Sequence, residues 1–154
     1  MESNREVIEK FYLAFKNKNI VEMQNCYADT AIFSDPIFHN LNAEQVRAMW
    51  EMLIKSGKDM RLEIVDIQGT DEGGMAEWTA YYTFSATGNK VVNHVKASFL
   101  IANGKIIKHT DSFSFYKWAR QALGIAGILL GWSSFLRNKV AKKARNNLDL
   151  YMVR

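Results

Sequence analysis

Cysteine and proline each occur only once in this sequence of 154 residues, as Cys26 and Pro36. One cysteine cannot form an internal disulfide, which argues against a disulfide-stabilised secreted scaffold and favours a reducing cytosol. The first residues are polar and lead directly into a helical pattern, so no signal peptide is expected and the predicted location is cytoplasmic. A chain of this length can bury a core within one domain.

Several motifs that carry chemistry are also missing. The sequence has no Gly-x-x-x-x-Gly-Lys phosphate loop and no Gly-x-Ser-x-Gly nucleophile elbow. It has no cysteine cluster and no His-x-x-x-His spacing, so neither a metal site nor a cofactor is expected. The apolar stretch at 122–132 is interrupted by glycines and is too short to span a bilayer.

Net positive charge is confined to the C-terminal quarter of the chain. From Lys117 to Arg154 there are eight basic residues and a single acidic one, Asp149, whereas residues 1–116 carry a net charge of −3. The overall charge of +4 therefore belongs to a tail. Because most of the chain is neutral to acidic, nucleic acid is not expected as a partner.

Hydrophobic spacing predicts three helices in the first third of the chain. Apolar residues recur at helical spacing over about 3–16, then behind an Asn19 N-cap, and again over about 43–56, where Asn42 and Gln45 form a capping-box pattern. Between the last two, residues 31–34 are prone to form a strand. Asp35-Pro36 ends that strand, because proline cannot continue a central ladder.

From Arg61 the hydrophobic period changes from 3.6 to 2, which predicts four consecutive strands, at about 61–70, 75–87, 90–102 and 105–117. Their separators are turn-like, and Asn103-Gly104 is the preferred hairpin turn. The predicted sheet is an antiparallel meander. Helices followed by strands indicate an α+β fold.

The last segment returns to helical spacing. Apolar residues recur every four positions from Leu136 to Met152, with lysine and arginine on the other faces, which predicts an amphipathic helix. We favour a helix that packs on its own domain with a solvated basic face. The alternative is a helix that lies on an anionic membrane surface or on nucleic acid.

Strand parity places a polar pair on the apolar face of the last strand, because residues two apart point the same way. His109 and Asp111 share that face with Ile107 and Phe113. Burial of such groups is costly unless they are paired or face a cavity.

Two more polar residues, Asp35 and His39, follow the short strand at 31–34. Together with His109 and Asp111 they form the predicted acid-base group, because desolvation raises a carboxyl pKa and imidazole shuttles protons near neutrality. The alternative is structural. His109 and Asp111 then form a satisfied buried hydrogen bond, and Asp35 is a turn residue.

The apolar faces predict a pocket with aromatic walls for a small hydrophobic molecule. The residues predicted to contact this ligand are Phe11, Tyr27, Trp50, Trp78, Tyr82, Asn93, Phe99 and Phe113. For the tryptophans, a purely structural role in the core is the alternative.

The order of the predicted elements resembles the nuclear transport factor 2-like superfamily, and within it the SnoaL-like polyketide cyclases and the ketosteroid isomerases. The matching stretches are 7–15, 25–36 with its Asp-Pro ending, and 92–107 with its Asn-Gly-Lys turn. The resemblance implies a cystatin-like cone over residues 1–116, in which a curved antiparallel sheet packs on three N-terminal helices. Residues 117–154 are then extra C-terminal helices packed on the same domain.

The resemblance also assigns roles to residues. Asp35 is similar to the general base of the isomerases, whereas Phe11 and Ala97 stand where those enzymes have their oxyanion donors. His109 and Asp111 resemble the strand-borne acid-base pair of the cyclases. Epoxide hydrolases of this fold use an Asp-Arg-Asp triad, for which Arg47 and Arg61 are the available arginines.

These observations support two hypotheses about function. The first is a cofactor-independent isomerase, cyclase or hydrolase that acts on a small hydrophobic carbonyl or ring compound through Asp/His acid-base catalysis. The second is a non-catalytic small-molecule binding protein of the same fold. The convex sheet face of such folds is a natural dimer surface, so a homodimer is expected by analogy.

Overall fold

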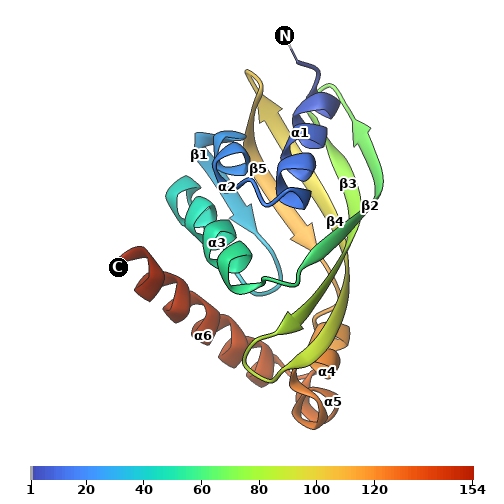
Figure 1. Ribbon diagram of the computed structural model, residues 1–154, viewed down its shortest axis with the longest axis vertical. Coiled ribbons are helices and arrows are strands. Elements are labelled where there is room, and N and C mark those ends of the chain that lie inside the picture. Colours follow the sequence, from blue (N-terminus) through green and yellow to red (C-terminus); the bar gives the residue numbers. More distant parts are fainter. Residues whose placement is uncertain (1) are drawn as a thin grey trace.

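The computed structural model describes residues 2–154 as helices packed on the concave side of a curved five-stranded sheet (Figure 1). The helices are α1 (Asn4–Lys16), α2 (Ile20–Asn25), α3 (Ala43–Ser56), α4 (Phe115–Leu123), α5 (Ile125–Leu130) and α6 (Ser134–Met152). The strands are β1 (Tyr27–Ser34), β2 (Arg61–Gly69), β3 (Gly73–Phe84), β4 (Asn89–Ala102) and β5 (Lys105–Ser112). The predicted α+β fold, with extra C-terminal helices, is confirmed.

Local signals set the ends of several elements as predicted. The Asn42 side chain accepts a hydrogen bond from the Gln45 backbone, and the Gln45 side chain accepts one from the Asn42 backbone, which completes the capping box of α3. Asn19 caps α2 in a similar way. Asn103 and Gly104 both have positive φ, at 52° and 74°, as a two-residue hairpin turn requires.

The sheet order is β1-β5-β4-β3-β2. The antiparallel meander from β2 to β5 is as predicted, but β1 joins its edge in parallel with β5, so the sheet is mixed. Tyr27 follows Ile20 and Met23 at helical spacing, yet α2 ends at Asn25 and Tyr27 begins β1. The parallel pairing aligns Ser34 with Thr110.

A bulge in β5 changes which residues face the core. Ile101 pairs with Ile106 and Leu100 with Lys108, so Ile107 is an extra residue on β5. As a result Ile106 and His109 are both buried, whereas Ile107 is only half-buried. The prediction that Ile107 faces inward was therefore wrong, although parity holds again for His109 and Asp111.

The last strand is shorter than predicted, because β5 ends at Ser112 and Ser114 caps α4 through a hydrogen bond to the Lys117 backbone. Beyond that point β4 is still paired with β3, but the described residues supply no strand on its other edge. The Gln121 side chain of α4 takes its place, accepting from Val92 N at 2.8 Å and donating to Val92 O at 3.0 Å. The helix thereby covers an open sheet edge.

The structure has two apolar clusters. The main core joins α1, α2 and α3 to the sheet, and a second cluster of Val91, Phe115, Trp118, Ala119, Ala122 and Leu136 lies between β4 and the C-terminal helices. Ile37, Tyr82 and Phe113 pack against both clusters. We call the boundary marked by these three residues the seam.

Helix α6 runs from α5 back toward α3 (Figure 1). Leu148 is fully buried in the main core, and the Tyr151 hydroxyl donates to Glu51 of α3 at 2.8 Å. The four-residue apolar spacing from Leu136 onward thus forms the packed face of α6. None of the helices within residues 2–154 has both the length and the hydropathy needed to cross a membrane.

The anchoring of α6 is testable with two neighbouring leucines. Leu148→Ala should lower the free energy of unfolding by about 2–4 kcal/mol, because it leaves a cavity in the main core. Leu150→Ala, at an exposed position of the same helix, should change it by less than about 0.5 kcal/mol. Urea unfolding measures both. Equal effects of the two substitutions would show that α6 is not anchored through Leu148.

Candidate active site

A chain of buried hydrogen bonds crosses the sheet and reaches α3. Trp50 Nε1 donates to the Tyr27 hydroxyl at 2.9 Å, Tyr27 Oη lies 2.8 Å from His109 Nδ1, and His109 Nε2 lies 2.7 Å from Asp111 Oδ1. Indole has only a donor, so the Tyr27 proton is free to go to His109 Nδ1. The arrangement that satisfies the Tyr27 proton is a His109 ring that accepts at Nδ1 and donates from Nε2 to Asp111 Oδ1.

Aromatic rings enclose this chain. The His109 ring lies 4.3 Å from the Phe99 ring, 4.9 Å from Phe33 and 5.6 Å from Phe11, measured between centroids. Burial raises the pKa of the Tyr27 phenol well above its ordinary value, so Tyr27 stays a neutral donor. His109 and Asp111 therefore form the predicted inward pair. Both ring nitrogens of His109 have a hydrogen-bond partner, Nδ1 in Tyr27 and Nε2 in Asp111.

Asp35 follows β1 directly and lies beside this pair, because the parallel register aligns the preceding Ser34 with Thr110. Asp35 Oδ1 accepts hydrogen bonds from the backbone of Ile37 at 2.7 Å and Phe38 at 2.6 Å. Desolvation raises the pKa of Asp35 to about 7; the two amides oppose that rise, and the charge of Asp111 adds to it. Asp35 is thus a turn residue and a titrating carboxyl near neutrality.

His39 does not join the other three residues. It is exposed to solvent, and within residues 2–154 no hydrogen bond or ion pair links it to Asp35, His109 or Asp111. The turn that follows Asp35 leaves the imidazole in solvent. The structure therefore gathers three of the four predicted acid-base residues.

The predicted ligand contacts divide into two groups. Phe11, Tyr27, Trp50, Trp78 and Phe99 are buried in the main core, where their rings pack against one another and against Tyr12, Phe15 and Phe33. These five fill the interior of the cone instead of lining an open pocket. Tyr82, Asn93 and Phe113 are half-buried at or near the seam. Burial raises the pKa of the Tyr82 phenol, and the charge of the nearby Asp35 raises it further.

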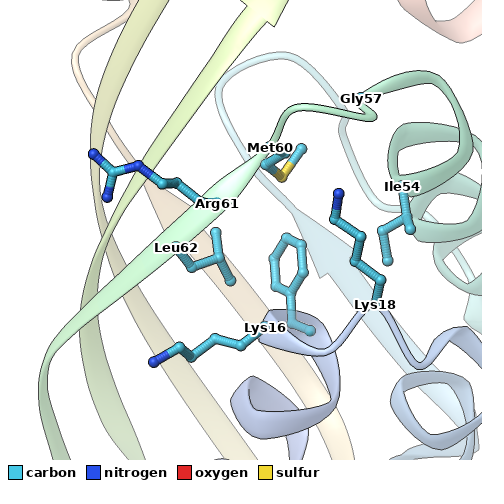
Figure 2. A pocket seen from close by; sticks show the side chains of 8 residues that line it. Lys16, Lys18, Ile54, Gly57, Met60, Arg61 and Leu62 are labelled. Carbon is cyan, nitrogen blue, oxygen red and sulfur yellow. The ribbon is translucent and has the colours of Figure 1, made fainter.

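Two cavities lie away from the predicted acid-base residues. Figure 2 shows the first, of about 10 Å³, where the end of α1 meets the end of α3 and the start of β2; it is lined by Phe15, Lys16, Lys18, Ile54, Gly57, Met60, Arg61 and Leu62. That space holds at most one water molecule. A second, open groove of about 610 Å³ runs along β1 and the turn between β4 and β5. Neither is lined by Asp35, His39, His109 or Asp111.

Two further donors lie in the core: Tyr12, which was not among the predicted site residues, and Trp78, which was predicted only as a ligand contact. Tyr12 Oη and Trp78 Nε1 are buried without a hydrogen-bond partner among residues 2–154. Burial raises the pKa of the Tyr12 phenol well above its ordinary value, and the charge of Asp111 contributes. The available signal was the pairing of adjacent apolar residues along α1, which buries Tyr12 as well as Phe11.

No group of three or more histidine, cysteine, aspartate or glutamate side chains capable of holding a metal ion occurs in the described part of the chain, residues 2–154.

The family model for the SnoaL-like domain matches residues 8–109, about two thirds of the chain. The protein belongs to the SnoaL-like family. The matched segment contains β1 with its Asp35 turn, the meander and His109, and it ends two residues before Asp111. No curated protein sequence matches the chain significantly.

Solved structures agree with the family. IdmH from Streptomyces antibioticus, provisionally described as a polyketide cyclase, is similar with a TM-score of 0.66 and 17% identity over 80% of this chain and 100% of its own. An LEH-like epoxide hydrolase from M. tuberculosis is similar with a TM-score of 0.63 and 15% identity; the match covers 86% of this chain and 94% of the hydrolase. A protein of ketosteroid isomerase-like fold from Catenulispora acidiphila has a TM-score of 0.65 and 11% identity; the match covers 76% of this chain and 92% of that protein. At these identities the likeness shows the fold.

The buried hydrogen-bond chain is testable by removing one hydroxyl. Tyr27→Phe leaves His109 Nδ1 and Trp50 Nε1 without a partner and should lower the free energy of unfolding by about 1–3 kcal/mol. Tyr12→Phe is the matched control, because it removes a buried hydroxyl that has no partner and should cost nothing measurable. Chemical unfolding measures the free energy of unfolding of both variants. An equal loss of stability in the two would mean that the buried hydrogen bonds of Tyr27 contribute no stability.

The raised pKa of Asp35 predicts a pH dependence of stability. The folded-state pKa of about 7 exceeds the ordinary value of 3.8, so between these values the folded protein binds a proton that the unfolded chain has lost. Stability contributed by Asp35 is complete below about pH 4 and is lost as the pH rises through 7. Asp35→Asn should flatten this slope in urea unfolding from pH 4 to 8. An unchanged slope would show that Asp35 titrates normally.

Proposed function

We propose that the protein is a cofactor-independent enzyme that moves a proton on a small hydrophobic carbonyl or ring compound at the seam. The observation that carries this proposal is the placement of two carboxyls in different environments at the ends of adjacent parallel strands. Asp111 is buried and paired with His109, whereas Asp35 is half-buried, with its Oδ2 outside the turn's hydrogen bonds. Such a division of environments is how carboxyl pairs acquire separate acid and base roles.

In this proposal Asp35 is the catalytic base. Its carboxylate takes a proton from a carbon next to the substrate carbonyl, the electron pair moves to the carbonyl oxygen, and the Asp35 carboxylic acid returns the proton to another carbon of the same compound. The reaction is an isomerisation, or a ring closure when the enolate carbon attacks a second carbonyl; in the ring closure the oxygen of that second carbonyl takes the proton from Asp35 instead. No oxidant or co-reactant is needed. A group with a pKa of about 7 suits both halves of this cycle.

The developing negative oxygen needs hydrogen-bond donors. Phe11 and Ala97, which stand where the isomerases have theirs, supply none. Tyr12 Oη and Trp78 Nε1 are buried donors without a hydrogen-bond partner of ordinary geometry among residues 2–154, although the Trp78 indole is near enough to lower the pKa of the Tyr12 phenol. Tyr12 also lies within range of the charge of Asp111. We assign them to the substrate oxygen, and this assignment requires the rings that fill the main core to move apart and admit it.

The buried His109 pair is assigned a positioning role. Tyr27 and His109 hold the Asp111 carboxyl in one orientation beside Asp35. The family and its neighbours support this class of chemistry, because a cyclase and an isomerase-like fold are among the similar structures.

Epoxide opening by an Asp-Arg-Asp triad is less well supported. Arg47 donates to the Tyr27 carbonyl at 2.7 Å and pairs with Asp29 at 3.1 Å. Arg61 pairs with Glu63 and stacks 3.9 Å over the Tyr81 ring. Both arginines are engaged away from Asp35, so the geometry favours proton transfer on carbon.

The test is deuterium exchange at the carbon next to the carbonyl in a panel of cyclic ketones and enones incubated in heavy water. The wild type should accelerate exchange of an accepted ketone, with a rate that rises as the pH increases through 7 because the base is the ionised form. Asp35→Asn should lower the rate by about 10²–10⁴-fold. Tyr12→Phe should lower it while leaving stability unchanged.

Asp66→Asn, at an exposed position of β2, is the matched control and should exchange at the wild-type rate. A ketone that protects the protein against thermal unfolding but undergoes no exchange would overturn the catalytic proposal. That result would favour the non-catalytic binding protein.

A further inference from the structure

Six large apolar side chains are exposed in one short stretch that runs from α5 to the first turn of α6. Their exposed fractions range from 43% to 76%, and they are Ile125, Ile128, Leu129, Leu130, Trp132 and Phe135. We call these residues the apolar tip. Helix α5 lies at the end of the molecule's long axis opposite the N-terminus (Figure 1), so the tip projects from the domain. Contiguous exposed apolar surface of this kind marks an interaction site.

The packing of α5 accounts for the exposure. A Cβ on Gly127 would lie 1.9 Å from the Ala119 carbonyl oxygen of α4, and one on Gly131 would lie 3.1 Å from the Tyr116 ring. Helix α5 therefore approaches α4 through its glycines, and its isoleucines and leucines turn to solvent. This is the reverse of an ordinary surface helix, which buries its large apolar residues.

Charge around the tip is of one sign. Between Asp111 and Asp149 the sequence contains seven basic residues and no acidic one. Six of them are exposed, and among residues 2–154 these six form no ion pair: Lys117, Arg120, Arg137, Lys139, Lys142 and Lys143. A partner of the tip must accept both an apolar surface and a surrounding field of positive charge.

The outer face of α6 continues this surface. Phe135, Lys139 and Lys142 are spaced four and three residues apart, so they share a helix face, and all three are exposed. Leu136, Val140 and Leu148 occupy the opposite face and pack against the protein. Lys139 and Lys142 therefore lie on the same side of α6 as Phe135 of the tip.

We propose that the apolar tip inserts into the surface of an anionic lipid bilayer, with the outer face of α6 lying over the headgroups. Leucine, isoleucine, tryptophan and phenylalanine fit the boundary between headgroups and acyl chains, and the flanking lysines and arginines fit negative lipids. A second copy of the chain fits less well, because a two-fold contact through the tip would bring two sets of like charges together. Nucleic acid would leave the aliphatic side chains without a partner.

The test is co-sedimentation of the full-length protein with vesicles of phosphatidylcholine alone and of phosphatidylcholine mixed with phosphatidylglycerol. Wild type should bind the mixed vesicles and bind phosphatidylcholine weakly. Leu129→Ser with Phe135→Ser should lower the partition coefficient at least about tenfold. Replacing Lys139, Lys142 and Lys143 by Gln should lower it about tenfold or more, on the mixed vesicles only. Trp132 is the one exposed tryptophan of the four, so its fluorescence should shift to shorter wavelength on binding.

Leu13→Ser with Val65→Ser is the matched control, because these two residues are as exposed as Leu129 and Phe135 but lie on α1 and β2. This variant should bind vesicles like wild type. Failure of the wild type to bind mixed vesicles at low ionic strength would overturn the proposal. A loss of self-association in the tip variant, measured by analytical ultracentrifugation, without any effect on vesicle binding would also overturn it and would assign the tip to a second copy.

Discussion

The hydrogen bond between His109 and Asp111 imposes the main constraint on this fold, because it places two ionisable groups inside an aromatic core. Burial of such groups is stable only when every donor and acceptor has a partner. The partners come from distant elements, since Tyr27 lies on β1 and Trp50 on α3. Satisfying the pair therefore fixes how β1 and α3 sit against β5.

The position of β1 has a direct consequence for the candidate site. Its parallel pairing with β5 brings the Asp35 turn beside Asp111, so two carboxyls that are distant in sequence influence each other. One of them is held by an imidazole in the core and the other by two backbone amides at the seam. The asymmetry between them, more than the presence of either one, supports acid-base chemistry.

The C-terminal helices do two different things. Helices α4 and α6 pack on the cone, where the Trp118 indole donates to the Tyr82 hydroxyl at 2.8 Å and Leu148 enters the main core. They thereby form one wall of the seam. Helix α5 packs through glycine and leaves its large apolar residues in solvent. The C-terminal helices thus complete the core on one side and expose large apolar side chains on the other.

Local sequence patterns predicted much of this architecture. Hydrophobic spacing and caps predicted α1, α3 and the packed face of α6, and period-two alternation with the Asn103-Gly104 turn predicted the meander and the inward direction of His109 and Asp111. Tertiary structure alone decided the bulge at Ile107, the parallel pairing of β1, the filling of the cone by Phe11, Trp50 and Trp78, and the outward position of His39. The reason is physical: periodicity records which side of an element is apolar, whereas hydrogen-bond partners and the space left between side chains depend on contacts such as that of Tyr27 with His109, 82 residues apart.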